Sequence, residues 1–299
     1  MPTTGNANIP NPRPRAGGFV QIRAFSKINL ILEVIKKRSD GYHELRSVMQ
    51  TLALHDTLTI KTKGKAPFTL TCNDPHLPTD HRNLVTQAAM YMIENYNITE
   101  PIHIDLVKRI PQGAGLGGGS SDCAATLTGI NDLFNLNISP NDMASIGQKF
   151  GADVPFCLLG GTALAKGIGE RLTSLPPHPY CWVVLACQKL EVSTGEIFSK
   201  WAPRESSTSN IPNMIQAIKT NNIEQIAANF SNDLTEITSK AININKVIDE
   251  MKIQGAIGAA MSGSGPTVFG YFSDKYAAEK ATRHMEILTG RAFLTEIVP

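Results

Sequence analysis

Apolar and polar positions alternate along the first part of the chain. Over residues 20–70 the apolar residues recur with a period of two, and turns rich in Asp and Gly interrupt the pattern. Successive side chains of a β-strand point to opposite faces of the sheet, so this period predicts strands joined by hairpins. The apolar positions Ile102, Ile104 and Leu106 predict a further strand with one buried face.

Helical spacing of apolar residues begins after these strands. Asn83 precedes the first helical segment and Ser139 precedes a second at 140–150; both are residue types that cap helix N-termini. Further along, the pattern predicts a strand at 181–187, several helices between 194 and 254, and a final strand, helix and strand. Strands and helices mix without a regular βαβα alternation, so we predict the α+β class.

The chain of 299 residues is long enough for two domains. Hydrophobic residues make up 42% and charged residues 18%, as in soluble globular proteins. Residues 1–17 are rich in Pro, Asn, Gly and Thr and offer almost nothing to bury, so we expect a disordered tail. The proline-rich run at 176–179 is typical of a linker. We therefore predict an N-terminal domain at 18–175 and a C-terminal domain at 176–299.

Composition also excludes several classes of function. The net charge of +2 and the lack of a dense Lys/Arg run argue against a nucleic-acid partner. No stretch approaches the roughly 18 apolar residues of a membrane span, and the N-terminus has no signal-peptide core. The five cysteines form no C-x-x-C pair, which fits reduced thiols and gives no zinc site. We expect a cytoplasmic protein without a membrane partner.

A glycine-rich segment after the predicted strand at 102–107 is the most informative part of the chain. It contains five glycines, which let the backbone turn tightly and bring its N–H groups onto one concave surface. Ser120 and Ser121 are expected to cap the helix that follows, and a helix N-terminus suits an anionic ligand. The segment therefore predicts a phosphate cradle. Its candidate residues are Pro111, Gly113, Ala114, Gly115, Leu116, Gly117, Gly118, Gly119, Ser120 and Ser121.

Three other interpretations of this segment compete with a phosphate cradle. A P-loop requires Gly-Lys followed by Ser or Thr, and no lysine lies between Lys108 and Lys149. Gly113, Gly115 and Gly118 satisfy the dinucleotide pattern G-x-G-x-x-G, but the second strand with a terminal acid that should follow is replaced by a predicted helix start. A dinucleotide fold is therefore disfavoured. A flexible surface loop without a ligand stays open at this point.

Lys27, Asn29 and Asp153 carry groups suited to chemistry, each with a simpler interpretation beside it. Lys27 lies in the middle of a predicted strand, where lysine either points to solvent or holds a hydroxyl, phosphate or carboxylate. Asn29 shares its face. Asp153 precedes Val154 and Pro155, a proline expected to keep the preceding helix from resuming. This aspartate either accepts a hydroxyl proton or is only a favourable turn residue.

Two further turns were singled out. The turn at 40–43 places Tyr42 and His43 next to each other, where flat rings either stack on a base or sugar or form an ordinary hairpin rim. A second glycine-rich loop at 261–267 either lets the backbone approach a ligand closely or is a tight connection between a helix and a strand.

Taken together, these segments resemble the superfamily of small-molecule kinases typified by galactokinase, homoserine kinase, mevalonate kinase and phosphomevalonate kinase (GHMP kinases). The similarity covers the chain from about residue 20 onward. It includes the glycine-rich segment, the loop at 261–267, and the segments 26–30, 38–43 and 150–156. Within the superfamily it is nearest to the branch that phosphorylates 4-diphosphocytidyl-2-C-methyl-D-erythritol in the non-mevalonate isoprenoid pathway.

The resemblance implies a fold, a reaction and roles for single residues. It implies a ribosomal-protein-S5-like N-terminal domain that binds ATP, a ferredoxin-like C-terminal domain and a cleft between them. Asp153 would take the proton from the substrate 2-hydroxyl, assisted by Lys27, with ATP and Mg²⁺ as cofactors and no protein residue assigned as a metal ligand. The cytidine diphosphate ester would be held by Asn29, Tyr42, His43 and Phe198.

Alternatives of other classes are a sister kinase acting on a small alcohol such as mevalonate or homoserine, and a nucleotide-binding module without catalysis. The turn at 40–43 argues against the sister kinase, because mevalonate and homoserine carry no base. The pairing of Asp153 with Lys27 argues against a binding module. The oligomeric state is expected to be a monomer or a homodimer.

Overall fold

The computed structural model describes residues 18–190, 192–203 and 209–299; the predicted disordered tail at 1–17 lies outside them. The chain forms two compact units, which we call unit 1 and unit 2. Unit 1 contains the residues up to Ala24, Asp56–Arg109 and Gly119–Leu158. Unit 2 contains Phe25–His55, Ile110–Gly118 and Leu159–Pro299. The predicted domains at 18–175 and 176–299 stay a prediction.

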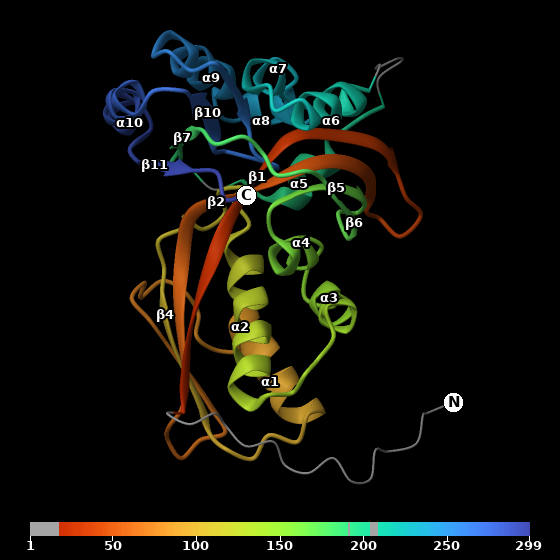
Figure 1. Cartoon of the computed structure of the whole chain (residues 1–299), viewed down its shortest axis with the longest axis vertical. Helices are drawn as coiled ribbons and strands as arrows, with labels where there is room; N and C mark the ends of the chain where they lie inside the picture. The colour runs from red at the N-terminus through yellow and green to blue at the C-terminus, as the bar shows by residue number, and fades with distance from the viewer. Residues whose placement is uncertain (1–17, 191, 204–208) are drawn as a thin grey trace. The chain divides into compact units, whose positions relative to one another are not determined.

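Strands and helices alternate irregularly along the chain (Figure 1). The strands are β1 (Phe19–Lys37), β2 (His43–Thr62), β3 (Phe68–Cys72), β4 (Ile102–Val107), β5 (Thr162–Gly167), β6 (Arg171–Ser174), β7 (Trp182–Ala186), β8 (Ser231–Asn232), β9 (Gly258–Met261), β10 (Val268–Phe272) and β11 (Ala292–Glu296). The helices are α1 (Leu84–Asn95), α2 (Gly118–Phe134), α3 (Pro140–Gln148), α4 (Val154–Leu159), α5 (Thr194–Ser199), α6 (Ile211–Lys219), α7 (Ile223–Ala228), α8 (Thr235–Ser239), α9 (Ile244–Ile253) and α10 (Lys275–Thr289).

The strands form two sheets. The first has the order β3-β4-β2-β1-β8, with β5 paired to β2 and β6 paired to β5; β1 and β2 are long enough to contribute to both units. The second, in unit 2, has the order β11-β7-β10-β9 and is antiparallel throughout. These sheets, with helices that do not alternate regularly with the strands along the chain, confirm the predicted α+β class.

The core of unit 1 follows the predicted alternation. Ile102, Ile104 and Leu106 of β4 are buried and pack with apolar residues of β2, α1 and α2, two helices that lie beside these strands (Figure 1). Asn83 caps α1, since its side chain accepts a 2.9 Å hydrogen bond from the N–H of Val85. Both sequence predictions are therefore confirmed.

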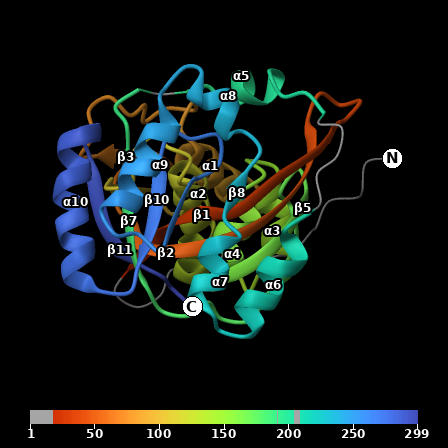
Figure 2. The same cartoon turned by 90° about the horizontal axis from the view of Figure 1, so that it is seen from above.

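The second sheet is buried on both faces. Val183 and Leu185 of β7 belong to one apolar cluster of unit 2, and Val184 and Ala186 belong to another. The first cluster includes residues of α6 and α7, and the second includes residues of α9 and α10, the two helices beside β10 and β7 in Figure 2. A continuous apolar run fits such a strand, because neither face meets water.

Two short strands were missed. The sequence pattern does not predict β8 and β9, which span only Ser231–Asn232 and Gly258–Met261. β8 is held by parallel pairing with β1, so its conformation depends on a strand about 200 residues away and not on its own pattern. In the part of the chain that the structure describes, no helix is both long and apolar enough to cross a membrane.

Candidate active site

Lys27 and Asn29 lie next to each other on β1, in unit 2. Both are buried, each with 4% of its surface exposed. The Nζ of Lys27 donates a 2.8 Å hydrogen bond to Oδ1 of Asn29, as expected for residues two positions apart on one face of a strand. The interpretation of Lys27 as a lysine pointing to solvent is therefore wrong, because the ammonium group is held inside the protein.

Ser47, on β2, extends this polar contact. The Nδ2 of Asn29 donates to Oγ of Ser47 over 2.8 Å, and this hydroxyl donates to the carbonyl oxygen of Ile31 over 2.6 Å. Buried polar groups are stable only when they are hydrogen-bonded, so this series fixes the amide of Asn29 and, through it, the ammonium of Lys27. No motif marks Ser47 in the sequence, because the contact joins two different strands.

The glycine loop at 110–118 is anchored in the core of unit 2. Gly113, Gly115 and Gly117 have positive φ angles of 59°, 75° and 70°. The residues between them, Ala114 and Leu116, are 5% and 1% exposed and belong to an apolar core cluster. The glycines thus supply the turns while the alternate side chains hold the loop down. The interpretation as a flexible surface loop is wrong.

The second glycine loop, at 262–267 between β9 and β10, contacts the backbone of the first. The Oγ of Ser262 donates a 2.9 Å hydrogen bond to the carbonyl oxygen of Gly115 and accepts a 3.3 Å bond from the N–H of Asn29. A Cβ atom on Gly115 would lie 2.3 Å from the carbonyl oxygen of Ser262, which no side chain tolerates. Ser262 therefore joins β1 to the middle of the first loop.

Asn232 and Thr238 hold the second loop in turn. The Nδ2 of Asn232 donates to the carbonyl oxygens of Met261 and Gly263 over 2.9 and 2.8 Å, and Oγ1 of Thr238 donates to that of Ser264 over 3.1 Å. The loop connects β9 to β10, two antiparallel strands, so its interpretation as a helix-to-strand turn is wrong. Its other interpretation, a backbone that approaches a ligand closely, stays a prediction.

Helix α2 begins directly after the first loop. Gly117 has a left-handed φ, and a Cβ atom there would lie 2.9 Å from Cγ of Lys27. This turn lets the helix start at Gly118, so the prediction that Ser120 and Ser121 cap the helix is wrong; both lie within its first turns. The first N–H groups of a helix have no intrahelical acceptor, which keeps this helix start suited to an anion.

His43 lies in an aromatic cluster of unit 2. Its ring centroid is 5.4 Å from that of Phe198 and 5.7 Å from that of Trp201. Burial, and then the charge of Lys37, lowers the pKa of His43 below its usual range, so the imidazole is neutral at pH 7. Sequence reasoning named His43 and Phe198 but missed Trp201, which follows Phe198 by three residues.

Tyr42 does not join this cluster. Its side chain is 60% exposed, and the ring contacts of the described residues do not include it. The turn that carries it is fixed by backbone bonds between Arg38 and Tyr42 and by Gly41 at a φ of 88°. Arg38 also pairs with Asp40 and Glu44, which ties the turn to the start of β2. Tyr42 is thus a ring on a defined turn, open to solvent.

Asp153 lies in unit 1, one residue before α4. Its carbonyl oxygen accepts a 3.1 Å hydrogen bond from the N–H of Cys157, and its side chain is partly exposed. Pro155 lies in the first turn of α4 and does not prevent a helix, because that turn needs no N–H at this position. The predicted helix with Ser139 as its cap is confirmed, and it ends at Gln148.

The described residues contain no group of three or more His, Cys, Asp or Glu side chains placed to hold a metal ion. Mg²⁺ is commonly bound through one or two protein ligands while phosphates and water complete its shell. The described residues therefore suit a metal ion that is coordinated mainly by the phosphates of a bound nucleoside triphosphate. They do not suit a metal ion that is coordinated by protein side chains alone.

Comparisons with known proteins agree with this arrangement. Family models match residues 83–161, described as the GHMP kinases N terminal domain, and residues 214–288, described as the GHMP kinases C terminal. A 4-diphosphocytidyl-2-C-methyl-D-erythritol kinase of Caldicellulosiruptor saccharolyticus is 42% identical over 92% of this chain and 95% of its own length.

Solved structures give the same result. A crystal structure of 4-(cytidine 5'-diphospho)-2C-methyl-D-erythritol kinase superposes with a TM-score of 0.81 and 30% identity, over 94% of this chain and all of that one. A homoserine kinase of Cytophaga hutchinsonii has a TM-score of 0.70 but only 20% identity, over 92% of this chain and 94% of that one, and so shares the fold alone. The chain belongs to the GHMP kinases and, among them, to the family of 4-diphosphocytidyl-2-C-methyl-D-erythritol kinases.

Proposed function

We propose that this protein transfers the γ-phosphoryl group of ATP to the 2-hydroxyl of 4-diphosphocytidyl-2-C-methyl-D-erythritol. The observation that carries the proposal is the contact between the buried Lys27–Asn29 pair and the backbone of the glycine loop, through Ser262 and Gly115. A buried ammonium at a glycine loop suits an anionic ligand. The resemblance of 92% of the chain to a curated relative supplies the substrate.

Asp153 is proposed as the general base. Its carboxylate takes the proton of the 2-hydroxyl as that oxygen forms a bond to the γ-phosphorus; the bond from the γ-phosphorus to the bridging oxygen breaks, and ADP leaves. Lys27 is proposed to assist this base and to help orient the hydroxyl. A base of this kind contributes about 10²–10⁴-fold to the rate.

The glycine loop and the start of α2 are proposed to hold the triphosphate. Phosphoryl transfer depends mainly on positioning and on charge stabilisation, which backbone N–H groups provide without titrating. Mg²⁺ bound together with the nucleotide would neutralise charge on the phosphates. No protein side chain is assigned to it.

His43, Tyr42 and Phe198 are proposed to recognise the cytosine. A neutral imidazole has one donor and one acceptor nitrogen, and the hydrogen-bonding edge of cytosine offers both kinds of group. The buried ring of His43 and its contacts with Phe198 support this role. Tyr42, exposed on its turn, is free to close over a base. We also propose a cytoplasmic enzyme, monomeric or homodimeric, without a nucleic-acid partner.

A coupled assay of ADP release tests the proposal. The protein, ATP and Mg²⁺ are combined with the cytidine diphosphate ester, with mevalonate or with homoserine, at equal concentrations. Turnover with the cytidyl ester alone is expected. Turnover with mevalonate or homoserine instead would retain the fold and the phosphate site but reject the role of His43 and Tyr42.

A further inference from the structure

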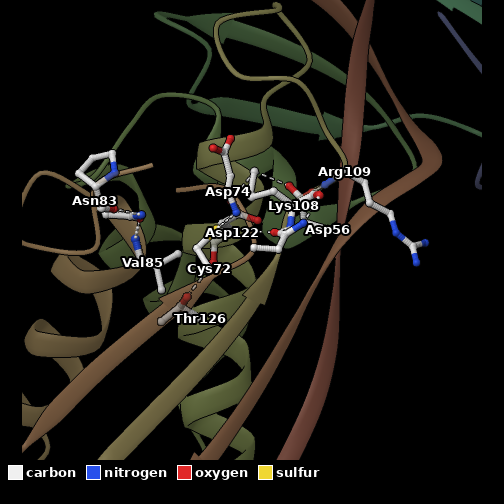
Figure 3. A network of polar contacts seen from close by, with 11 residues as sticks. Asp56, Cys72, Asp74, Asn83, Val85, Lys108, Arg109, Asp122 and Thr126 are labelled. Atoms are coloured by element: carbon white, nitrogen blue, oxygen red, sulfur yellow. Dashed lines mark hydrogen bonds and ion pairs between the residues drawn. The ribbon is translucent and has the colours of Figure 1, made fainter. Parts of the chain in front are cut away.

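Unit 1 contains a buried ionic cluster that the proposed reaction does not use (Figure 3). Lys108, directly after β4, lies between Asp56 of β2 and Asp122 near the start of α2. The side chains are 7%, 0% and 5% exposed, respectively. The Nζ of Lys108 pairs with Oδ2 of both aspartates, and its distance to Oδ2 of Asp122 is 2.7 Å. We call these three residues the ionic clasp.

The clasp connects the two chain ends that run into the glycine loop. The loop leaves unit 1 after Arg109 and the chain returns to unit 1 at Gly119. Asp56 accepts a hydrogen bond from the backbone N–H of Arg109 as well as from Lys108. Figure 3 shows the guanidinium of Arg109 pointing away, so only its backbone takes part. Through Lys108, the same contacts reach Asp122 in α2.

The two carboxylates are not equivalent. Both oxygens of Asp56 accept hydrogen bonds, Oδ1 from Arg109 and Oδ2 from Lys108. Only Oδ2 of Asp122 does so, and its Oδ1 is buried without a hydrogen-bond partner among the described residues. An ionised carboxylate with an unpaired buried oxygen is costly, whereas a protonated one has less charge to solvate.

The net charge of the cluster also favours a protonated Asp122. Two carboxylates and one ammonium would leave a net negative charge in a buried site, and one proton removes it. Burial is the largest effect on Asp122 and raises the pKa of its carboxyl; Lys108 opposes the shift and Asp56 adds to it. For Lys108, burial acts to lower the pKa, and the two aspartates more than offset it, so the ammonium stays charged.

We propose that the ionic clasp positions both ends of the glycine loop for ATP, with Asp56 as its charged anchor and Asp122 as its protonated, neutral member. This inference rests on the proposed function of the loop as the ATP site. Fixing the backbone of a residue costs conformational entropy. A loop whose ends are already fixed loses less freedom when it binds a nucleotide, so the clasp acts on ATP affinity more than on the chemical step.

Steady-state kinetics of three variants test the clasp. Asp56→Asn keeps the side-chain size but turns an acceptor into a donor facing Lys108 or Arg109, so KM for ATP should rise at least tenfold. KM for the cytidyl substrate should stay within twofold. Asp122→Asn resembles a protonated carboxyl and should raise KM for ATP less than threefold.

Lys61→Met is the matched control. Lys61 of β2 pairs with Asp105 of β4, so this ion pair joins the same two strands, but it is 30% and 40% exposed. It should leave both KM values unchanged. If Asp56→Asn behaves like this control, or if Asp122→Asn raises KM for ATP as much as Asp56→Asn does, the proposal is overturned.

Infrared spectroscopy tests the protonated member independently of activity and of how Asp56→Asn folds. The difference spectrum between the wild type and Asp122→Asn at neutral pH should contain the carbonyl stretch of a protonated carboxylic acid. Its absence would show that Asp122 is ionised and would reject its assigned role. A wild-type chain that has this band but no ATP-dependent turnover would instead contradict the proposed function and leave the charge assignment intact.

Discussion

Two buried polar clusters hold different parts of the glycine loop by different physical means. In unit 2, the middle of the loop is joined to β1 through Ser262, in a series of hydrogen bonds that includes Asn29 and Ser47. In unit 1, the chain ends beside the loop are joined by ion pairs of Lys108. Losing one neutral hydrogen bond typically costs about 0.5–1.5 kcal/mol, whereas removing one partner of a buried ion pair costs about 3–5 kcal/mol.

This difference implies different behaviour under mutation. The hydrogen-bonded cluster tolerates the loss of a donor, since its geometry also rests on backbone contact between the two glycine loops. The ionic clasp tolerates a neutral substitute only where the native group is itself neutral. Neither cluster contains the proposed base, Asp153.

The largest expected effect is a loss of kcat without a loss of nucleotide affinity. Asp153→Asn removes the proposed base but adds no bulk, so kcat should fall about 10²–10⁴-fold. Nucleotide affinity, measured by titration with a non-hydrolysable ATP analogue, should stay within about threefold of the wild type. A variant with near-normal kcat would exclude Asp153 as the base.

Lys108→Met should be the most destabilising change in unit 1. It leaves two carboxyl groups facing each other without the ammonium, and we expect the free energy of unfolding to fall by about 3–5 kcal/mol. Lys61→Met, at the exposed pair on the same strands, should change it by at most about 1 kcal/mol. Urea denaturation of both variants measures the difference, and equal effects would contradict the role given to burial.

The titration of His178, a residue of unit 2, predicts that the free energy of unfolding depends on pH. Burial lowers the pKa of its imidazole to about 4, and its ring contacts the backbone of Pro179 and the hydroxyl of Tyr271. Below its ordinary pKa of 6.5 the unfolded chain binds a proton that the folded chain does not. The contribution of His178 to stability is therefore complete above pH 6.5 and decreases as the pH falls towards about 4, by roughly 3 kcal/mol in total.

Urea denaturation at several pH values tests the role of His178. Relative to His178→Gln, in which position 178 does not titrate, the wild type should lose stability progressively between pH 6.5 and 4. The difference between the two free energies of unfolding isolates His178, because all other titrating groups are common to both proteins. Parallel profiles for the two proteins would show that His178 is not the group responsible.

Ser262→Ala tests the hydrogen-bonded cluster. The carbonyl oxygen of Gly115 and the N–H of Asn29 would each lose a partner, so we expect a loss of about 1–3 kcal/mol in stability. KM for ATP should rise, by less than in Asp56→Asn, because the backbone contact at Gly115 is kept. A larger rise than in Asp56→Asn would reverse the comparison between the two clusters.

The smallest expected effect concerns the cytosine. His43→Ala should raise KM for the cytidyl substrate about tenfold, equivalent to about 1.4 kcal/mol, and leave KM for ATP nearly unchanged. Trp201→Phe is the matched variant, since it keeps a ring beside His43 and should change either KM less than twofold. Equal increases for both substrates in His43→Ala would contradict the cytosine assignment.

Local patterns predicted the parts of the molecule that depend on neighbouring residues. The period of two placed Lys27 and Asn29 on one face of a strand, and the caps at Asn83 and Ser139 marked two helix starts. Motif reasoning also located the glycine loop. The resemblance to a family added the substrate, which no single residue specifies.

Contacts between distant segments could not be predicted in the same way. Asp56 and Lys108 are separated by 52 residues, and Ser262 and Gly115 by 147. An isolated aspartate in a strand carries no sign of such a partner. The misplaced helix caps at Ser120 and Ser121 have a related cause, because the helix start is set by the approach of Lys27 to Gly117 and not by local capping preference.

Phosphorus NMR of the reaction product tests the central proposal most directly. After incubation with ATP and Mg²⁺, the cytidyl product should keep both diphosphate resonances and gain one phosphate monoester resonance. The phosphorus of this monoester should couple to the carbon that carries the 2-hydroxyl in the substrate. A monoester on another hydroxyl, or an unchanged substrate, would contradict the assigned reaction.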